Sequence, residues 1–176
     1  MRKALLWCGF APVVFVIVLL VEGWLRPGYD PVHQFGSELS LGPRGWIQVT
    51  NFVVTGVLVL AFATRLRGAL AVLIAIFGAT LVVAGLFTTD PNHQSVAGMI
   101  HDLNSLPNFA ALAAATFVAS AKRIYRWYSA GTGVVVVAGF VAAIATPEHG
   151  LWQRICIVAG FCWVGALAVR TARPSP

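Results

Sequence analysis

Six apolar stretches separated by short polar connections constrain the fold of this chain more than any other feature. They cover about residues 4–24, 46–63, 69–87, 100–120, 129–145 and 154–170. An apolar helix of about 20 residues crosses the ~30 Å hydrocarbon layer of a bilayer, and about 17 residues suffice where the bilayer thins. Because the chain has 176 residues, 59% of them apolar and 10% charged, the stretches leave no room for a separate soluble domain. The sequence predicts one all-α integral membrane domain, residues 1–176.

The charged residues alternate between the two ends of these stretches. Most of the 12 basic residues lie at the termini and in the even-numbered connections: Arg2, Lys3, Arg65, Arg67, Lys122, Arg123, Arg126, Arg170 and Arg173. The odd-numbered connections hold every acidic residue and histidine: Glu22, Asp30, His33, Glu38, Asp90, His93, His101, Asp102, Glu148 and His149. Basic loops stay in the cytoplasm. We therefore expect a bundle of six transmembrane helices arranged as three outward-turning hairpins, with both termini cytoplasmic.

The same distribution decides which partners to expect. A net charge of +6 in a soluble protein could indicate nucleic-acid binding. Here the charge resolves into a basic inner side and a slightly acidic outer side, so it reports topology. We expect membrane lipids as partners and no nucleic acid. The three cysteines lie within predicted spans without C-x-x-C spacing, which favours apolar packing over a redox role.

Two outer connections share a short string. Asp30-Pro31-Val32-His33-Gln34 recurs 60 residues later as Asp90-Pro91-Asn92-His93-Gln94, through either duplication of a hairpin or coincidence. The first of these connections, residues 23–45, is too long for a simple turn. Residues 35–41, closed by Gly42-Pro43, predict a short interfacial or re-entrant segment within it.

Two predicted spans carry polar residues at helical spacing. Gln48, Asn51 and Thr55 form one stripe, and the fourth span carries another: His101, Asn104, Ser105 and Asn108. Each stripe descends about 10 Å from the outer end and should face the bundle interior, because amides exposed to lipid lack hydrogen-bond partners. We expect an outward-facing polar cavity with Ser37 and Asp102 at its rim. The alternative is structural, since interhelical polar contacts are worth ~0.6 kcal/mol on average.

Chemistry at this cavity would depend on a few titratable groups. A part-buried carboxylic acid such as Asp90 or Glu38, with a raised pKa, could protonate an olefin or assist hydrolysis beside His101. Zinc could be held by His33, His101 and Asp90, since imidazole and carboxylate suit that metal. Alternatively, Asp90 caps a turn, Asp102 caps the start of the fourth helix and the loop histidines are only solvated. The sequence contains no H-x-x-x-H pair and no G-x-S-x-G nucleophile motif.

Four strings carry a family resemblance: Arg26 to Pro31 (RPGYDP), Ser37 to Phe52 (SELSLGPRGWIQVTNF), Gly85 to Pro91 (GLFTTDP) and Gly98 to Ser105 (GMIHDLNS). Over about residues 5–168 the chain resembles domain-of-unknown-function family nine hundred and ninety-eight. The resemblance implies a helical bundle in a bacterial cytoplasmic membrane with no established activity or cofactor. Many members carry a second histidine just before the glycine of the fourth-helix motif, where this chain has Ala97, so a metal site requiring that ligand would be incomplete here.

Three functional hypotheses follow. The first is a non-catalytic membrane protein whose outer cavity binds a lipid or other amphipathic molecule. The second is a membrane-embedded enzyme, either a metal-assisted lipid hydrolase or an acid-catalysed isoprenoid cyclase, that uses Asp90, His101 and Glu38. The third is a small-molecule transporter, which is disfavoured because the inner halves of the spans hold almost no polar residues.

Overall fold

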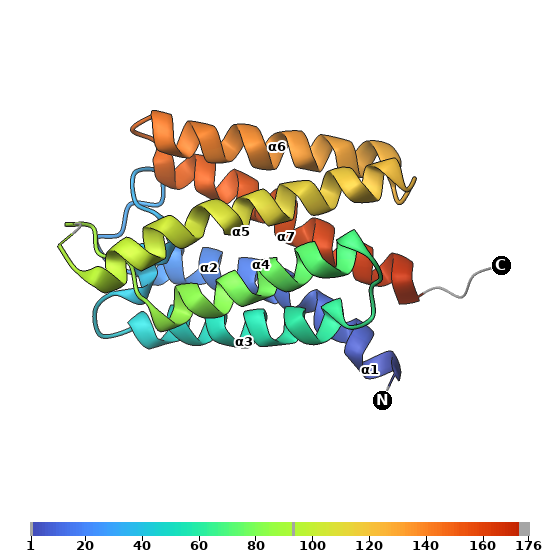
Figure 1. Ribbon diagram of the computed structural model, residues 1–176. Coiled ribbons are helices and arrows are strands. Elements are labelled where there is room, and N and C mark those ends of the chain that lie inside the picture. Colours follow the sequence, from blue (N-terminus) through green and yellow to red (C-terminus); the bar gives the residue numbers. More distant parts are fainter. Residues whose placement is uncertain (1, 93, 173–176) are drawn as a thin grey trace.

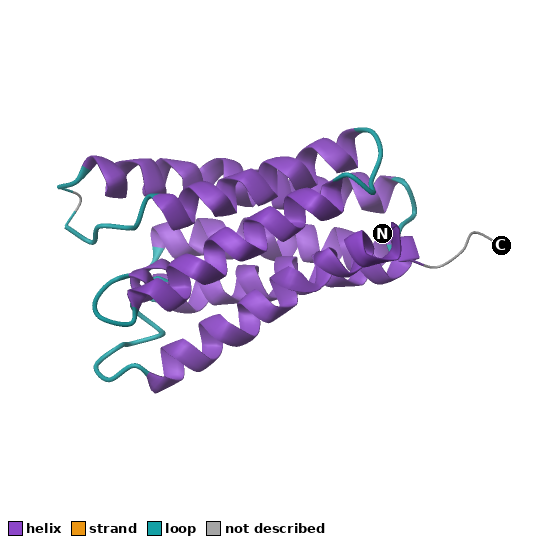
Figure 2. Ribbon diagram, turned by 90° about the horizontal axis from the view of Figure 1, so that it is seen from below, coloured by secondary structure: helices purple, strands orange, loops and turns teal. Residues whose placement is uncertain are grey.

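The chain folds into an all-helical bundle, as the sequence predicts. The computed structural model describes residues 2–92 and 94–172, and within these ranges it contains helices and loops but no strand. Figures 1 and 2 show the helices running roughly alongside one another. The elements are α1 (Arg2–Trp7), η1 (Cys8–Phe10), α2 (Ala11–Leu25), η2 (Gly36–Ser40), α3 (Gly45–Ala63), α4 (Ala69–Leu86), α5 (Val96–Ala121), α6 (Arg126–Ala145) and α7 (His149–Ala172).

Five segments are long and apolar enough to cross a membrane. They are Leu5–Leu25, Gly45–Ala63, Ala69–Leu86, Arg126–Ala145 and His149–Ala172, and each overlaps a span predicted from the sequence. The remaining predicted span, 100–120, lies within α5, a 26-residue helix that is not among the five. A membrane protein with several apolar helices is therefore supported. The count of six spans and their pairing into three hairpins stay predictions.

Successive helices pack against one another. From α2 onward each long helix contacts the next in sequence, and α7 also contacts α2. The loops between α2 and α3, α4 and α5, and α6 and α7 lie at one end of the bundle, which we call the acidic end (Figure 1). Helix α1 and the last turns of α7 lie toward the opposite, basic end together with the α3–α4 and α5–α6 loops.

Glycines allow α3 and α4 to approach each other closely. A Cβ atom placed on Gly56 would lie 2.6 Å from the carbonyl oxygen of Gly78, and one on Gly78 would lie 2.9 Å from that of Gly56. Backbones approach this closely only where both residues lack side chains. The paired glycines thus fix the position of α3 beside α4.

Helices α5 and α6 are close at one end and apart at the other. Toward the basic end, a Cβ on Gly133 of α6 would meet the Thr116 hydroxyl of α5 at 2.4 Å. Toward the acidic end the two helices diverge (Figure 1). Pro107 lies inside α5 between these regions and cannot donate the helical hydrogen bond to the carbonyl four residues earlier. This divergence leaves space at the acidic end.

The long α2–α3 connection folds back onto the bundle. Its short helix η2 is the segment expected around residues 35–41, and Leu39 within it is fully buried. Arg154 of α7, only 7% exposed, anchors the connection by donating to the carbonyl oxygens of Pro31 at 2.7 Å and Gln34 at 3.0 Å. Its guanidinium also donates to the Tyr29 hydroxyl. Burial of that hydroxyl raises the pKa of Tyr29, and this effect outweighs the lowering of the pKa by the nearby Arg154.

We predict that Gly56→Ala destabilises the bundle by about 1–3 kcal/mol, because the added methyl group overlaps the α4 backbone. Gly131→Ala is the matched control, since a Cβ there meets nothing within 4 Å and removal of a helical glycine should stabilise by about 0.5–1 kcal/mol. Unfolding midpoints of the purified variants in detergent measure the difference. Equal midpoints for both variants would contradict close α3–α4 packing.

Candidate functional site: an inner pocket and its vestibule

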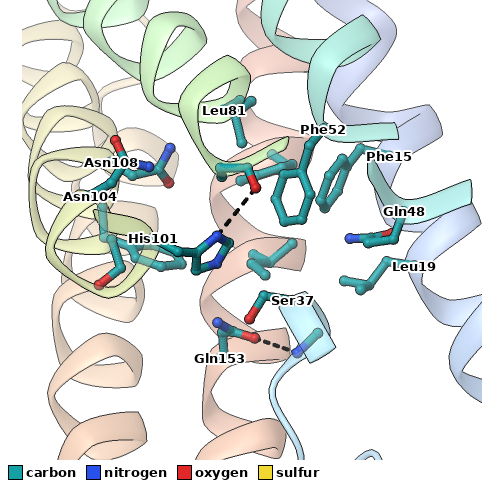
Figure 3. Close-up of a pocket in the computed structure, with 16 residues that line it drawn as sticks. Phe15, Leu19, Ser37, Gln48, Phe52, Leu81, His101, Asn104, Asn108 and Gln153 are labelled. Atoms are coloured by element: carbon teal, nitrogen blue, oxygen red, sulfur yellow. Dashed lines mark hydrogen bonds between the residues drawn. The ribbon is translucent and has the colours of Figure 1, made fainter. Parts of the chain in front are cut away.

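A polar pocket lies among the helices near the acidic end. Its volume is about 50 Å³, which is room for a few water molecules or one small functional group. The polar side chains that line it are Ser37, Gln48, His101, Asn104, Ser105, Asn108 and Gln153. The apolar part of the wall includes Phe15, Leu19, Phe52, Leu81, Phe109 and Phe161. Figure 3 shows the polar groups arranged around the space beside the His101 ring. We call this space the inner pocket.

A larger cavity of about 520 Å³ adjoins the inner pocket. It lies where α5 and α6 diverge, and we call it the vestibule. Both cavities are lined by Ser37, His101, Ser105, Phe109 and Gln153. The remaining vestibule wall is half apolar and half polar, with Phe35, Phe140, Ala143 and Ile144 on the one hand and Thr89, Asp102, Thr146 and His149 on the other. Together the cavities run from the bundle interior to the side of α6, where Ile144 is 72% exposed.

His101 joins α5 to the end of α4. Its Nδ1 atom lies 2.8 Å from the carbonyl oxygen of Phe87 and 3.2 Å from that of Ala84. The last carbonyls of a helix have no partner within the helix, so the imidazole caps α4. His101 is 8% exposed, and its ring packs edge-on against Phe52 at 6.1 Å between centroids. This contact holds the ring beside the inner pocket.

Two asparagines of α5 bond to a single threonine of α4. Asn108 Nδ2 donates to the Thr80 hydroxyl at 2.7 Å, and Asn104 Nδ2 donates to the Thr80 carbonyl oxygen at 2.8 Å. The Thr80 hydroxyl in turn donates to carbonyl oxygens of its own helix, that of Phe77 at 2.9 Å among them. The polar stripe predicted in the fourth span, which lies on α5, therefore both connects α5 to α4 and forms part of the pocket wall.

The stripe on α3 is also buried, but its residues separate. Gln48 is 1% exposed, Asn51 9% and Thr55 3%. Gln48 lines the inner pocket, whereas Asn51 lines an apolar groove between α2 and α3. Asn51 Nδ2 donates to the Gln48 Oε1 atom and to the Phe15 carbonyl oxygen, each at 3.2 Å. Asn51 thus holds the Gln48 amide from the side that faces away from the inner pocket.

Two buried polar atoms in these walls have no hydrogen-bond partner among the described residues. One is Gln48 Nε2 in the inner pocket, and the other is Thr146 Oγ1 in the vestibule. The amide end of Gln48 points into the pocket (Figure 3). An unpaired buried polar group costs about 1–3 kcal/mol, so a water or ligand that pairs with either atom would relieve that cost.

Asp90 has a structural position in the α4–α5 loop. Its carboxylate accepts from the backbone N–H groups of Asn92, Gln94 and Ser95 at 2.8–3.0 Å. Hydrogen bonds from the Ser95 side chain, and then from these backbone groups, lower the pKa of Asp90. The acid catalyst considered in the sequence analysis requires the opposite shift. A Cβ on Gly98 would lie 2.4 Å from Asp90 Cβ, so the loop packs tightly on α5.

Asp30 repeats this arrangement in the α2–α3 connection. Its carboxylate accepts from the Val32 N–H at 2.9 Å and pairs with His33 Nδ1 at 2.7 Å. The His33 side chain, followed by the Val32 N–H, lowers the pKa of Asp30. The shared Asp-Pro string therefore forms similar aspartate-capped turns. The histidine of the second string, His93, lies outside the described residues.

The structure places the predicted catalytic trio in three settings. Only His101 lines the cavities, while Asp90 caps its loop. Glu38 caps η2 by accepting from the Phe35 N–H at 2.8 Å and from Gln34 Nε2 at 3.0 Å. Neither carboxylate is among the described residues that line the inner pocket or the vestibule. Catalytic roles for these residues stay hypotheses.

The structure does not add support to the zinc hypothesis. Within residues 2–92 and 94–172, no group of three or more His, Cys, Asp or Glu side chains is placed to hold a metal ion. Of the three expected ligands, His33 pairs with Asp30 in an exposed turn, His101 caps α4 and Asp90 caps its own loop. Zinc stays a hypothesis based on residue type.

Some site residues have no clear signal in the sequence. Thr80 is a single hydroxyl in an apolar run, where threonine usually bonds to its own helix. Gln153 lines both cavities, and its Oε1 atom accepts from the Gly36 N–H at 2.7 Å. Gln153 could have been found from the sequence, because it is a glutamine directly before a predicted apolar span. Nothing marks Thr80 as the partner of α5.

The fold and this site define a multi-pass membrane protein with a polar cavity near one end. Residues 10–170 match the model of the family described as protein of unknown function, DUF998, and the chain belongs to that family. The resemblance noted in the sequence is thereby confirmed. No curated protein and no solved structure matches the chain.

Thr80→Val should destabilise the protein by about 1–2 kcal/mol, because it removes the buried acceptor of Asn108 with little change in volume. Thr64→Val is the control, since that hydroxyl makes a similar bond to its own helix at the Ala61 carbonyl oxygen but is exposed. Thermal unfolding in detergent reports both changes. An unfolding temperature unchanged in the Thr80 variant would show that the α4–α5 connection contributes nothing to stability.

Proposed function

We propose that this protein binds an amphipathic molecule, with the polar group in the inner pocket and the apolar part in the vestibule. The observation that carries the proposal is Gln48 Nε2, a buried donor at the wall of a cavity that has no partner within residues 2–92 and 94–172. Protein interiors rarely leave such a group unpaired. An occupant that accepts a hydrogen bond there explains why the donor is retained.

The composition of the walls supports an amphipathic ligand. Both cavities combine polar with apolar groups: Gln48 and Asn108 line the inner pocket beside several phenylalanines, and Phe140, Ala143 and Ile144 line the vestibule beside polar side chains. A volume of about 520 Å³ is within the usual range of about 300–1,000 Å³ for ligand sites. The Thr146 hydroxyl, which has no partner among the described residues, gives the vestibule a further donor for an ester or ether oxygen.

The vestibule lies on a side of the bundle that carries exposed apolar residues. Leu103 and Leu106 of α5 are 70% and 62% exposed, and Ile144 of α6 is 72% exposed. Such surfaces are stable when they contact lipid chains. A ligand that is itself lipid-like can therefore reach the vestibule from the membrane between α5 and α6.

For the orientation, we infer that the acidic end faces outward across a bacterial cytoplasmic membrane, with both termini inside. The support is the concentration of basic residues in the α3–α4 and α5–α6 connections and near the termini. In that orientation the cavities open in the outer half of the membrane.

Ala143→Phe should weaken binding of amphipathic probes at least about tenfold, because the phenyl ring fills the vestibule that this buried alanine lines. Ala145→Phe, on an exposed position outside the lining, should leave binding unchanged. Native mass spectrometry of the purified variants with dodecanol, dodecanoate and dioctanoylphosphatidylcholine measures retention. If the wild type binds none of the three and no glycerolipid or isoprenoid alcohol, the proposed function is refuted.

Orientation is tested with single cysteines on a background in which Cys8, Cys156 and Cys162 are replaced. We expect Asn92→Cys, at the acidic end, to react with a membrane-impermeant maleimide on intact cells. Thr64→Cys, exposed at the basic end, should react only after the membrane is opened. The reverse labelling pattern would overturn the orientation.

A further inference from the structure

The hydrogen bonds of His101 determine which ring nitrogen carries the proton. Both partners of Nδ1 are carbonyl oxygens, at 2.8 and 3.2 Å, and a carbonyl oxygen can only accept. Nδ1 is therefore the N–H donor. In the neutral ring Nε2 has no proton and accepts. Nε2 makes no hydrogen bond to the described residues and lies on the pocket side of the ring in Figure 3.

Gln48 supplies the complementary group. Its Oε1 atom accepts from Asn51 Nδ2, so the amide oxygen is engaged away from the cavity and the amide nitrogen is left for the pocket. The inner pocket thus presents a donor on Gln48 and an acceptor on His101. The Ser37 hydroxyl, which can serve in either sense, lies beside them in Figure 3.

We propose that the ligand is a neutral lipid alcohol, recognised through its hydroxyl group. A hydroxyl both donates and accepts, so it can donate to His101 Nε2 and accept from Gln48 Nε2 at the same time. A methyl ether or an ester oxygen can only accept, and it would leave the acceptor on His101 unpaired. This inference rests on the proposed function, because it names the ligand class of the same site.

Charge disfavours both a phospholipid and a fatty acid, and size also disfavours a phospholipid. None of the described residues that line the inner pocket is Asp, Glu, Lys or Arg, and burying an unpaired carboxylate or phosphate is very costly. A pocket of about 50 Å³ accommodates a hydroxymethyl group but not a phosphocholine group. A compact, uncharged head group fits both limits.

Two sources share this chemistry: the free hydroxyl of a diacylglycerol, and the terminal hydroxyl of an isoprenoid or fatty alcohol. The test uses matched pairs on the purified full-length protein in detergent. The probes are dioctanoylglycerol and its methyl ether, farnesol and its methyl ether, and dioctanoylphosphatidic acid. Titrations followed by native mass spectrometry give a Kd for each probe, and the tighter of the two alcohols identifies the source.

We expect at least one alcohol to bind about tenfold or more tightly than its own methyl ether and, for the glycerolipid, than the phosphatidic acid. Gln48→Met keeps the length of the side chain but removes the amide donor, and it should abolish most of this preference. Gln94→Met is the control, since that side chain is exposed in the α4–α5 loop. Unfolding temperatures establish that both variants are folded.

The outcomes separate the two proposals. If alcohols and ethers bind equally, if phosphatidic acid binds best, or if Gln48→Met keeps the full preference, hydroxyl recognition is wrong although the cavity binds amphipathic molecules. If neither these probes nor the three used for the proposed function bind the wild-type protein, the proposed function itself fails. A hydroxyl preference that disappears in Gln48→Met and persists in Gln94→Met supports both.

Discussion

The scarcity of hydrogen-bond partners in a lipid environment governs this structure. Helices satisfy their own backbone groups, so the remaining demand comes from helix ends and polar side chains. His101 satisfies the end of α4, and Arg154 satisfies carbonyls of the α2–α3 connection. Thr80 satisfies two asparagines of α5. Because nearly every polar group in the bundle is satisfied in this way, the few that are not become informative.

The same constraint explains how α5 is accommodated among more apolar helices. On composition alone α5 is not among the segments apolar enough to span a membrane. Its amides, however, bond to α4, and its histidine caps α4, so these polar groups need no partner from lipid. Two helices that satisfy each other can enter lipid as a pair although one of them alone is too polar. The polarity of α5 should therefore be judged for the α4–α5 pair and not for α5 alone.

Helical spacing predicted some of the buried polar residues, although Asn104 and Ser105 of the same α5 stripe are only partly buried. It placed Gln48 and Asn51 on one face of α3, and His101 and Asn108 on one face of α5, and all four are buried. It could not predict partners, because Thr80 differs in no visible way from any threonine in an apolar helix. The roles of Asp90 and Glu38 depend on turn geometry, in which a carboxylate accepts backbone N–H groups. From residue type alone, a catalytic role for these carboxylates was as plausible as a role in capping a turn.

From the sequence alone, a structural role and a ligand-binding role for the polar residues were alternatives. His101 shows how one residue can have both roles. The ring has two nitrogens, and capping of α4 uses Nδ1. Because the cap requires a proton on Nδ1, it also leaves Nε2 without one in the neutral ring. A group that stabilises the fold on one side thereby becomes a defined acceptor on the other. In the proposed site, recognition of the ligand depends on the same contact that ends α4, so binding and helix termination are physically linked.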